Sequence, residues 1–289
     1  MQTMKLGIDL SYVMKKRDGG LRTAEEAVKL CADAGFDCLD YVSDYKRGDW
    51  RENALREREI IEKAGLFVEQ SHAPYNRYDR APIEVFGPEM RRSFEAAALL
   101  GARHMVVHAD EYTPVDHWNP EEIAGQMYEF YAPLVEFAGA HNMDVAFENL
   151  FEDHCFKEID GCSRYCSRVE EILCLLERFK GAPVSCCWDF GHAKCAYGTD
   201  KMLDALEKAA PFVSCTHVHD NYYGHDLHIL PFMGETDWEA HMALLKKHDY
   251  RGQMTFEFVY GRFPDALMPV FMTMAAQTGR YLVELFDRA

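Results

Sequence analysis

Residues 23–42, TAEEAVKLCADAGFDCLDYV, contain one complete helix and the strand that follows it. Thr23 is suited to cap the helix, because its side-chain oxygen can accept a hydrogen bond from a first-turn N–H. Two glutamates in that turn oppose the positive end of the helix dipole. Gly35 ends the helix, since glycine adopts a left-handed backbone conformation at little cost. The apolar run Phe36–Val42 then predicts a buried strand.

The same arrangement recurs along the chain. DAGFDCLD, KAGLFVEQ and LLGARHMVV each place a glycine between a helix end and a strand, and short apolar runs alternate with amphipathic stretches eight times. This alternation is typical of βα units. The chain has 289 residues, 48% of them hydrophobic, and a (β/α)8 TIM barrel typically takes about 250 residues. We therefore predict a single TIM barrel domain over residues 1–289. The predicted strands are Lys5–Leu10, Phe36–Val42, Leu66–Ala73, His104–Asp110, Met143–Leu150, Val184–Phe190, Phe212–His219 and Gln253–Val259.

Five long irregular segments are expected, and each follows a predicted strand. Loops at the carboxyl ends of barrel strands build the active sites of this class of fold. The placement of the long segments therefore indicates an enzyme. They are Asp44–Arg51, Tyr75–Pro88, Asp110–Pro120, Phe151–Ser167 and Asn221–Asp237.

Composition narrows the class of protein. MQTMKLGIDL has no signal-peptide pattern and no apolar run reaches the roughly 20 residues of a membrane span, so we expect a soluble, cytoplasmic protein. The 10 cysteines form no CxxC pair and mostly fall in apolar segments, which predicts reduced core thiols. The formal charge of −17 disfavours a nucleic-acid partner, because binding to the phosphate backbone depends on Lys and Arg.

Every predicted strand from the third onward ends in a residue that can bind a metal. Glu148 in DVAFENL and Glu257 in MTFEFVY stand inside apolar runs, where a carboxylate is costly unless it is paired or coordinated. Because strand ends converge at the barrel mouth, the pattern predicts a metal site there. The residues at these ends are His72, His108, Glu148, Asp189 with His192 behind it, His217, His219 and Glu257.

Each of these residues also has a plainer interpretation, since a single polar residue at a strand end is more often just hydrogen-bonded. His141 and His248 fall at helix ends, where a surface role is ordinary. His104 opens a strand at the opposite face of the barrel. The other histidines expected at the surface are His117, His154 and His241.

Seven motifs occur in order between residues 72 and 257, at the strand ends and in the loop after the seventh strand. They are HAPY at His72, VVHAD at His108, FENL at Glu148, WDFGH from Trp188, THVHDN from Thr216, HDLHILPFMG from His225 and FEF at Glu257. In this combination the chain resembles the xylose-isomerase-like TIM barrel superfamily. That superfamily holds sugar and sugar-phosphate isomerases and epimerases, together with the endonuclease IV type of DNA-repair enzyme (AP endonuclease family 2).

The resemblance implies a core site of Glu148, Asp189, His217 and Glu257 around one divalent ion, Mn2+, Zn2+, Mg2+ or Co2+. The mixed carboxylate and imidazole set suits such ions. In the isomerase and epimerase branch the two glutamates, here Glu148 and Glu257, serve as acid and base through a cis-enediolate. His192 would contact substrate oxygens.

The endonuclease IV branch implies a second possibility. That branch holds three zinc ions, and all nine of its ligand positions are filled here. His72 and His108 match the ligands of one further ion, with Glu148 as the bridging carboxylate. His192, Asp226 and His228 match the ligands of another. A zinc phosphodiesterase acting on abasic DNA is therefore the alternative to a sugar isomerase.

Three observations favour the carbohydrate substrate. Sugar-processing members of the superfamily can retain the extra histidines. The mouth-side loops lack a dense basic stripe. Trp50 and Trp118 fall in those loops, where an aromatic ring can stack on a sugar. Further expected substrate contacts are His219 and, for a phosphate group, Arg77, Arg80, Lys194 and Arg262.

One feature departs from the epimerase pattern that the resemblance implies. The substrate-binding arginine that epimerases carry after the seventh-strand histidine is absent, because Tyr222 and Tyr223 occupy that region.

The aromatic C-terminal helix Leu267–Phe286 would pack either on its own barrel or on a second subunit, which leaves a homo-oligomer open. The sugar and its phosphorylation state stay open as well.

Overall fold

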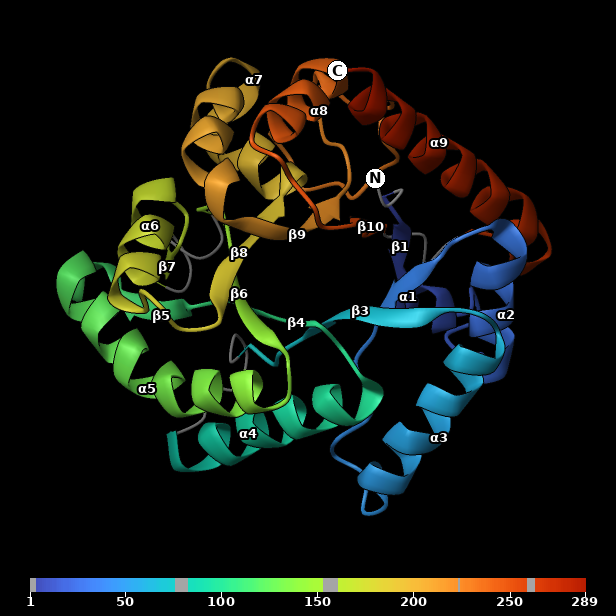
Figure 1. The fold of residues 1–289 in the computed structure, drawn as a ribbon, viewed down its shortest axis with the longest axis horizontal. Helices are drawn as coiled ribbons and strands as arrows, with labels where there is room; N and C mark the ends of the chain where they lie inside the picture. Colours follow the sequence, from blue (N-terminus) through green and yellow to red (C-terminus); the bar gives the residue numbers. More distant parts are fainter. Residues whose placement is uncertain (1–3, 76–82, 153–160, 223, 259–262) are drawn as a thin grey trace.

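The computed structural model describes residues 4–75, 83–152, 161–222, 224–258 and 263–289. Eight parallel strands close into a barrel in the order β1-β10-β9-β8-β6-β4-β3-β2, and helices surround them (Figure 1). The predicted (β/α)8 fold is confirmed. The barrel strands are β1 Leu6–Asp9, β2 Cys38–Asp40, β3 Phe67–His72, β4 His104–Val107, β6 Asp144–Glu148, β8 Val184–Asp189, β9 Val213–Val218 and β10 Met254–Phe256.

The helices begin and end with the expected cap chemistry where the local sequence supplies it. Thr23 and Glu26 form a reciprocal capping box at the start of α2, and Gly35 ends that helix with φ 98°. The described helices are α1 Leu10–Met14, α2 Ala24–Ala34, α3 Trp50–Lys63, α4 Ile83–Leu100, α5 Pro120–Ala140, α6 Val169–Arg178, α7 Phe190–Ala209, α8 Trp238–Lys247 and α9 Met268–Arg288. Short 3-10 turns cover Val115–His117, Ala210–Phe212 and Asp265–Leu267.

Two of the segments expected to be irregular pair with each other instead. β5 Asp110–Pro114 and β7 Cys162–Tyr165 form an antiparallel two-stranded sheet outside the barrel. Each strand is only five or four residues long, so neither shows a periodicity that sequence alone can read. A third such segment, Tyr75–Pro88, overlaps α4, which begins at Ile83 and contains Pro88. The sheet places residues from two separate loops beside the barrel mouth.

The C-terminal helix packs on its own barrel. α9 contacts α2, α8 and β1. The described cysteines are free thiols and most are buried, as predicted. None of the helices in the described ranges is both long enough and apolar enough to cross a membrane.

The contact between α9 and β1 generates a stability prediction. A Cβ at Gly279 would lie 2.4 Å and 2.7 Å from the two methyl carbons of Leu6. Gly279→Ala should therefore destabilise the protein by about 1–2 kcal/mol, as overpacked cores do. Gly125, inside α5, has nothing within 4 Å of such a Cβ. Gly125→Ala should stabilise by about 0.5–1 kcal/mol, because alanine favours the helix. Denaturant unfolding measures both, and a stabilised Gly279→Ala would contradict this packing.

Candidate metal centre

A cavity of about 510 Å³ opens at the carboxyl ends of the barrel strands. Its wall holds Glu148, Glu257 and four of the predicted site histidines. The residues that line it are Asp9, Ser11, Tyr12, Lys15, Asp40, Val42, Tyr45, His72, Ala73, Pro74, Tyr75, His108, Glu111, Glu148, Phe151, Arg164, His192, Asp226, His228 and Glu257.

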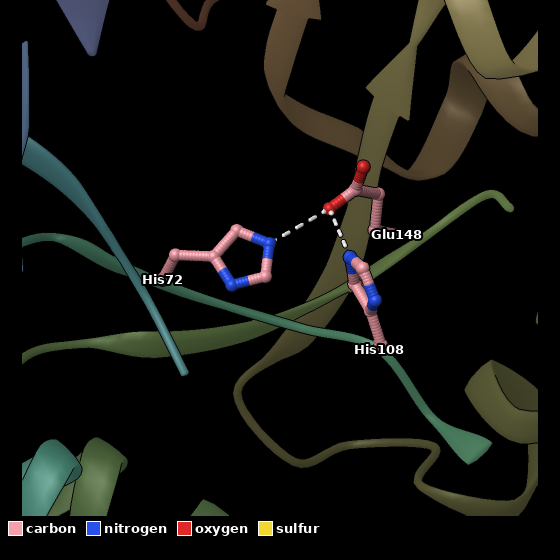
Figure 2. A group of neighbouring side chains, drawn as sticks. All are labelled: His72, His108 and Glu148. Atoms are coloured by element: carbon pink, nitrogen blue, oxygen red, sulfur yellow. Dashed lines mark hydrogen bonds and ion pairs between the residues drawn. The ribbon is translucent and has the colours of Figure 1, made fainter. Parts of the chain in front are cut away.

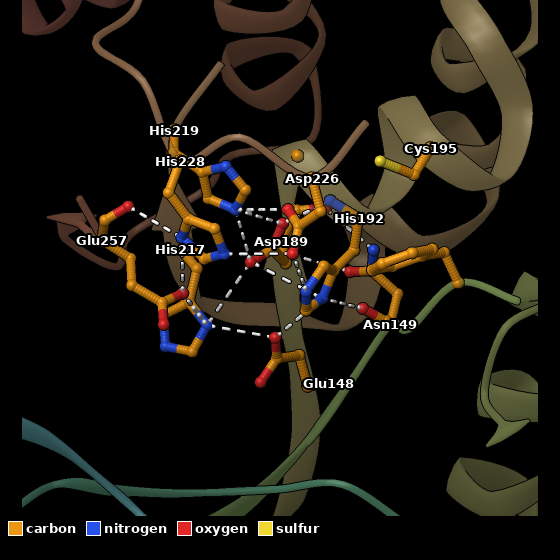
Figure 3. A network of polar contacts seen from close by, with 12 residues as sticks. Glu148, Asn149, Asp189, His192, Cys195, His217, His219, Asp226, His228 and Glu257 are labelled. Atoms are coloured by element: carbon orange, nitrogen blue, oxygen red, sulfur yellow. Dashed lines mark hydrogen bonds and ion pairs between the residues drawn. The ribbon is translucent and has the colours of Figure 1, made fainter. Parts of the chain in front are cut away.

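Three carboxylates converge on one nitrogen of His217 (Figure 3). His217 Nδ1 lies 3.2 Å from Glu148 Oε1, 3.5 Å from Glu257 Oε2 and 3.7 Å from Asp189 Oδ2. This nitrogen is buried and has no hydrogen-bond partner among the described residues. Glu148, Asp189 and His217 are each at most 1% exposed. Carboxylates crowded together in a dry interior repel one another unless a cation lies among them, so this group fits a divalent ion.

The neighbouring imidazoles keep Glu148 and Asp189 ionised. Burial alone would raise the pKa of Glu148, but His217 and His108 outweigh it and hold that pKa well below its usual value. The same balance applies to Asp189, where His192 and His219 overcome burial and lower the pKa. The two groups therefore present charged oxygens, the form that binds a metal ion.

The other oxygen of Glu148 faces a second group of ligands. His72 Nε2 lies 3.2 Å and His108 Nε2 lies 3.3 Å from Glu148 Oε2 (Figure 2). One ligand atom from each of the three residues falls within 4.8 Å of the others. Burial lowers the pKa of His108, but the carboxylates of Glu111 and Glu148 raise it to about 9 overall. This group also has the donors and the spacing for an ion.

A third group lies on the α7 side of the cavity. His228 Nε2 is 3.1 Å and His192 Nε2 is 3.8 Å from Asp226 Oδ2. His219 stacks on His228 with ring centroids 3.9 Å apart, and its Nε2 lies 3.1 Å from Asp189. Together, the three groups contain all nine residues expected from the resemblance. Glu257, which belongs to the first group through His217, also lies beside His219 and His228.

Local sequence explains how the strand ends are held together. Asp189 ends β8 and also caps α7, because its Oδ1 accepts from the backbone N of His192 at 2.6 Å. Asn149, directly after β6, exchanges two hydrogen bonds with the backbone of Asp189, at 2.7 Å and 2.8 Å. Gly191 is required because a Cβ there would lie 1.8 Å from the ring of His219. The WDFGH and FENL motifs thus supply ligand residues and also the contacts that position them.

The HDN motif after β9 organises the loop that carries Asp226 and His228. Asp220 accepts hydrogen bonds from three backbone N–H groups of residues 232–236 and from Trp238 Nε1. Asn221 Oδ1 accepts from the backbone N of Leu227 at 2.6 Å and of His228 at 3.3 Å. These two residues hold the loop in place through its backbone N–H groups.

The predicted site residues began at the third strand, so two carboxylates at the ends of the first two strands were missed. Asp40 ends β2, and its Oδ2 lies 3.2 Å from His217 Nε2 and accepts from Gln70 at 3.1 Å. Asp9 ends β1 and lines the cavity. Burial, followed by the charges of Asp40 and Glu257, raises the pKa of Asp9 to about 8. The signal was present, because LGID and CLD each end an apolar run in an acid, as DVAFE does.

Several expected substrate contacts lie elsewhere. Trp118 packs 6.1 Å from the ring of Tyr165, and Lys194 is buried beside Glu235 at 3.2 Å. Neither residue lines the described cavity. Trp50 is buried against Tyr45. The proposed phosphate contacts Arg77, Arg80 and Arg262 lie outside the described residues.

The remaining histidines are mostly where the sequence placed them. His117 and His141 are exposed, and His248 lies 2.9 Å from Glu207. His241 is wrong as a surface residue: it is 1% exposed and packs against Phe190, because this side of α8 faces the barrel. His154 lies outside the described residues.

The fold and the site together define a closed parallel barrel with acids and imidazoles gathered at the carboxyl ends of its strands. The chain belongs to the xylose isomerase-like TIM barrel family, whose model matches residues 28–269.

Three particular proteins show the range of its relatives. An uncharacterized protein of Sinorhizobium fredii (strain NBRC 101917 / NGR234), y4fM, is 25% identical over 276 residues, covering 85% of this chain and 83% of its own. A putative xylose isomerase from Rhodospirillum rubrum superposes with a TM-score of 0.79 at 18% identity, covering 96% of this chain and 99% of that one. A D-tagatose 3-epimerase-like protein superposes with a TM-score of 0.74 at 18% identity, over 99% of both chains.

The opposite end of the barrel generates a pH prediction. His104 Nδ1 pairs with Asp144, and its Nε2 lies 3.5 Å from Glu69 Oε1. Burial lowers the pKa of His104, but Cys215 and these two carboxylates raise it well above 6.5 overall. Protonated His104 therefore stabilises the fold fully below pH 6.5, and this contribution is lost as pH rises through the raised pKa. The difference in unfolding free energy between wild type and His104→Asn should shrink across that interval. A constant difference from pH 6 to 10 would contradict the assignment.

Proposed function

We propose that this chain is a divalent-metal-dependent sugar or sugar-phosphate isomerase or epimerase. One observation carries the proposal: Glu148 and Glu257, from strand ends on different sides of His217, both reach its Nδ1 and both line the cavity. Membership of the xylose isomerase-like family supports it. So does the likeness in fold to a D-psicose 3-epimerase, with a TM-score of 0.73 at 16% identity.

Glu148, Asp189, His217 and Glu257 would hold the ion. Carboxylates suit Mg2+ and Mn2+ and an imidazole suits Zn2+, so this mixed set is compatible with Mn2+, Zn2+, Mg2+ or Co2+. When bound, such an ion polarises a substrate carbonyl and the neighbouring hydroxyl, which makes the adjacent C–H bond more acidic. The Nδ1 of His217, with carboxylate oxygens 3.2 Å, 3.5 Å and 3.7 Å away, is the feature that fits such an ion.

The two glutamates would move the proton. One carboxylate removes the proton from the carbon beside the carbonyl, and the C–H electron pair becomes the double bond of a cis-enediolate. The other glutamate, holding a proton, returns one to carbon. Delivery to the opposite face of the same carbon inverts its configuration. Delivery to the neighbouring carbon moves the carbonyl, provided that the hydroxyl proton on the first carbon passes to the former carbonyl oxygen. His192, which lines the cavity, would contact substrate oxygens.

Glu148→Gln and Glu257→Gln test these roles. Each variant should lose about 100-fold or more in proton exchange, because an amide cannot accept the carbon-bound proton. The measurement is deuterium incorporation from D2O into ketohexoses and their phosphates by NMR, with divalent ion present and metal content determined. Glu69→Gln is the matched control. Glu69 is also a buried glutamate of a barrel strand, but it lies on β3 at the end of the barrel opposite the cavity. Unchanged exchange in both mouth variants would refute the acid and base assignment.

A zinc phosphodiesterase is the second candidate, because one specific observation favours it. The three groups described above each contain a compact ligand set, and Glu148 belongs to two of them. The charge of the cavity opposes a polyanionic substrate: among its described lining residues the permanent cations are Lys15 and Arg164. DNA binding relies on such cations.

Metal stoichiometry combined with an incision assay separates the two candidates. We expect the protein loaded with Zn2+ to leave a duplex with one abasic site intact, because the mouth offers few cations to the phosphate backbone. Metal per chain is measured by mass spectrometry on the same sample. Three bound ions together with strand cleavage that a chelator abolishes would replace the isomerase proposal with the phosphodiesterase.

A further inference from the structure

The β5–β7 sheet places a buried ion pair behind the ligand group His72, His108 and Glu148. Glu111 lies on β5 and Arg164 on β7, and they are 2% and 6% exposed. Arg164 Nε lies 3.9 Å from Glu111 Oε1. Both residues line the cavity. Charged side chains this deeply buried are uncommon unless they are paired or have a task at a site.

Glu111 contacts the ring nitrogen of His108 that does not face Glu148. His108 Nε2 points to Glu148, as Figure 2 shows, while its Nδ1 lies 2.5 Å from Glu111 Oε1. An imidazole that binds an ion through one nitrogen donates its proton through the other. A carboxylate at that second position fixes the tautomer and the ring orientation and strengthens the ligand.

Arg164 holds Glu111 in this position. Its guanidinium lies 5.1 Å from the centre of the Phe151 ring, and its Nη1 donates to the backbone oxygen of Phe151. Phe151 directly follows the FENL segment that carries Glu148. The register of the sheet shifts between Asp110 and Thr113, which is where Glu111 lies. Because a buried carboxylate needs a compensating charge, Arg164 is placed to balance the charge of Glu111.

The two histidines of this group are oriented differently. His72 Nδ1 lies 2.9 Å from the backbone oxygen of Ala73, which is a neutral acceptor. His108 alone of the two has a charged acceptor behind it. Of the two ligands, His108 is therefore the one that a carboxylate behind it can strengthen.

We propose that Glu111 and Arg164 are positioning residues for a divalent ion bound by His72, His108 and Glu148, through which the β5–β7 sheet sets the affinity of that group. The inference rests on the proposed function only in requiring that this chain binds divalent ions.

The experiment titrates metal-free protein with Zn2+ against a chromogenic chelator, using folded variants. Glu111→Leu should weaken one equivalent of Zn2+ by about 10- to 100-fold, the usual effect of removing such a partner. Glu111→Gln keeps an oxygen that accepts from Nδ1 and should recover part of the affinity. Arg164→Met should weaken the same equivalent less than Glu111→Leu, since Glu111 itself remains.

Asp144→Asn is the matched control. It alters another histidine–carboxylate pair, in which Asp144 contacts His104 Nδ1. His104 begins β4, and His108 lies just after the other end of that strand. The substitution should lower stability while leaving Zn2+ affinity unchanged. Wild-type affinity in both Glu111→Leu and Arg164→Met, or an equal loss in Asp144→Asn, overturns the inference while leaving the proposed function standing. A wild-type protein that binds no divalent ion would overturn both.

Discussion

The organising constraint of this molecule is the meeting of three carboxylates, two of them fully buried, at one imidazole nitrogen. Glu148 comes from β6, Asp189 from β8, and Glu257 follows β10, so no local interaction brings them together. Closure of the parallel sheet does, because it draws all carboxyl strand ends to one rim. Burying like charges opposes folding, and the apolar barrel core must outweigh that cost. The site is therefore a consequence of barrel closure, and any cation that enters it stabilises the closed form.

Neighbouring imidazoles limit the electrostatic cost of this arrangement. His217 has Asp40 on Nε2 and Glu148 near Nδ1, at 3.2 Å each. His219 pairs with Asp189 and stacks on His228, which faces Asp226. The rim thus alternates acids and imidazoles instead of gathering one kind of charge. This alternation also explains how a chain with a formal charge of −17 can bury so many acids at one end.

Local signals made part of this structure predictable. Thr23 and Gly35 bound α2 because a cap needs only its neighbours in sequence. The strand-end acids were visible because a carboxylate inside an apolar run is costly. The pairing of β5 with β7 was not predictable, since it joins two short segments about fifty residues apart in sequence, and neither has a periodicity of its own. The burial of His241 depends on the rotation of α8 about its axis, which the local sequence does not fix. Glu111 and Arg164 come together only when the β5–β7 sheet forms, so their pairing was not predictable either.

The chemistry available to this site would depend on how many ions share Glu148. Its Oε1 lies 3.0 Å from His192 Nδ1 and 3.2 Å from His217 Nδ1, while its Oε2 faces His72 and His108. An ion held at the His217 group alone would leave Oε2 as the oxygen of Glu148 that takes a proton from carbon. An ion held by His72, His108 and Glu148 as well would draw on the charge of the same carboxylate and make it a weaker base, so proton transfer would then depend more on Glu257. The affinity of the His72 group therefore bears directly on how the two glutamates divide the acid and base roles.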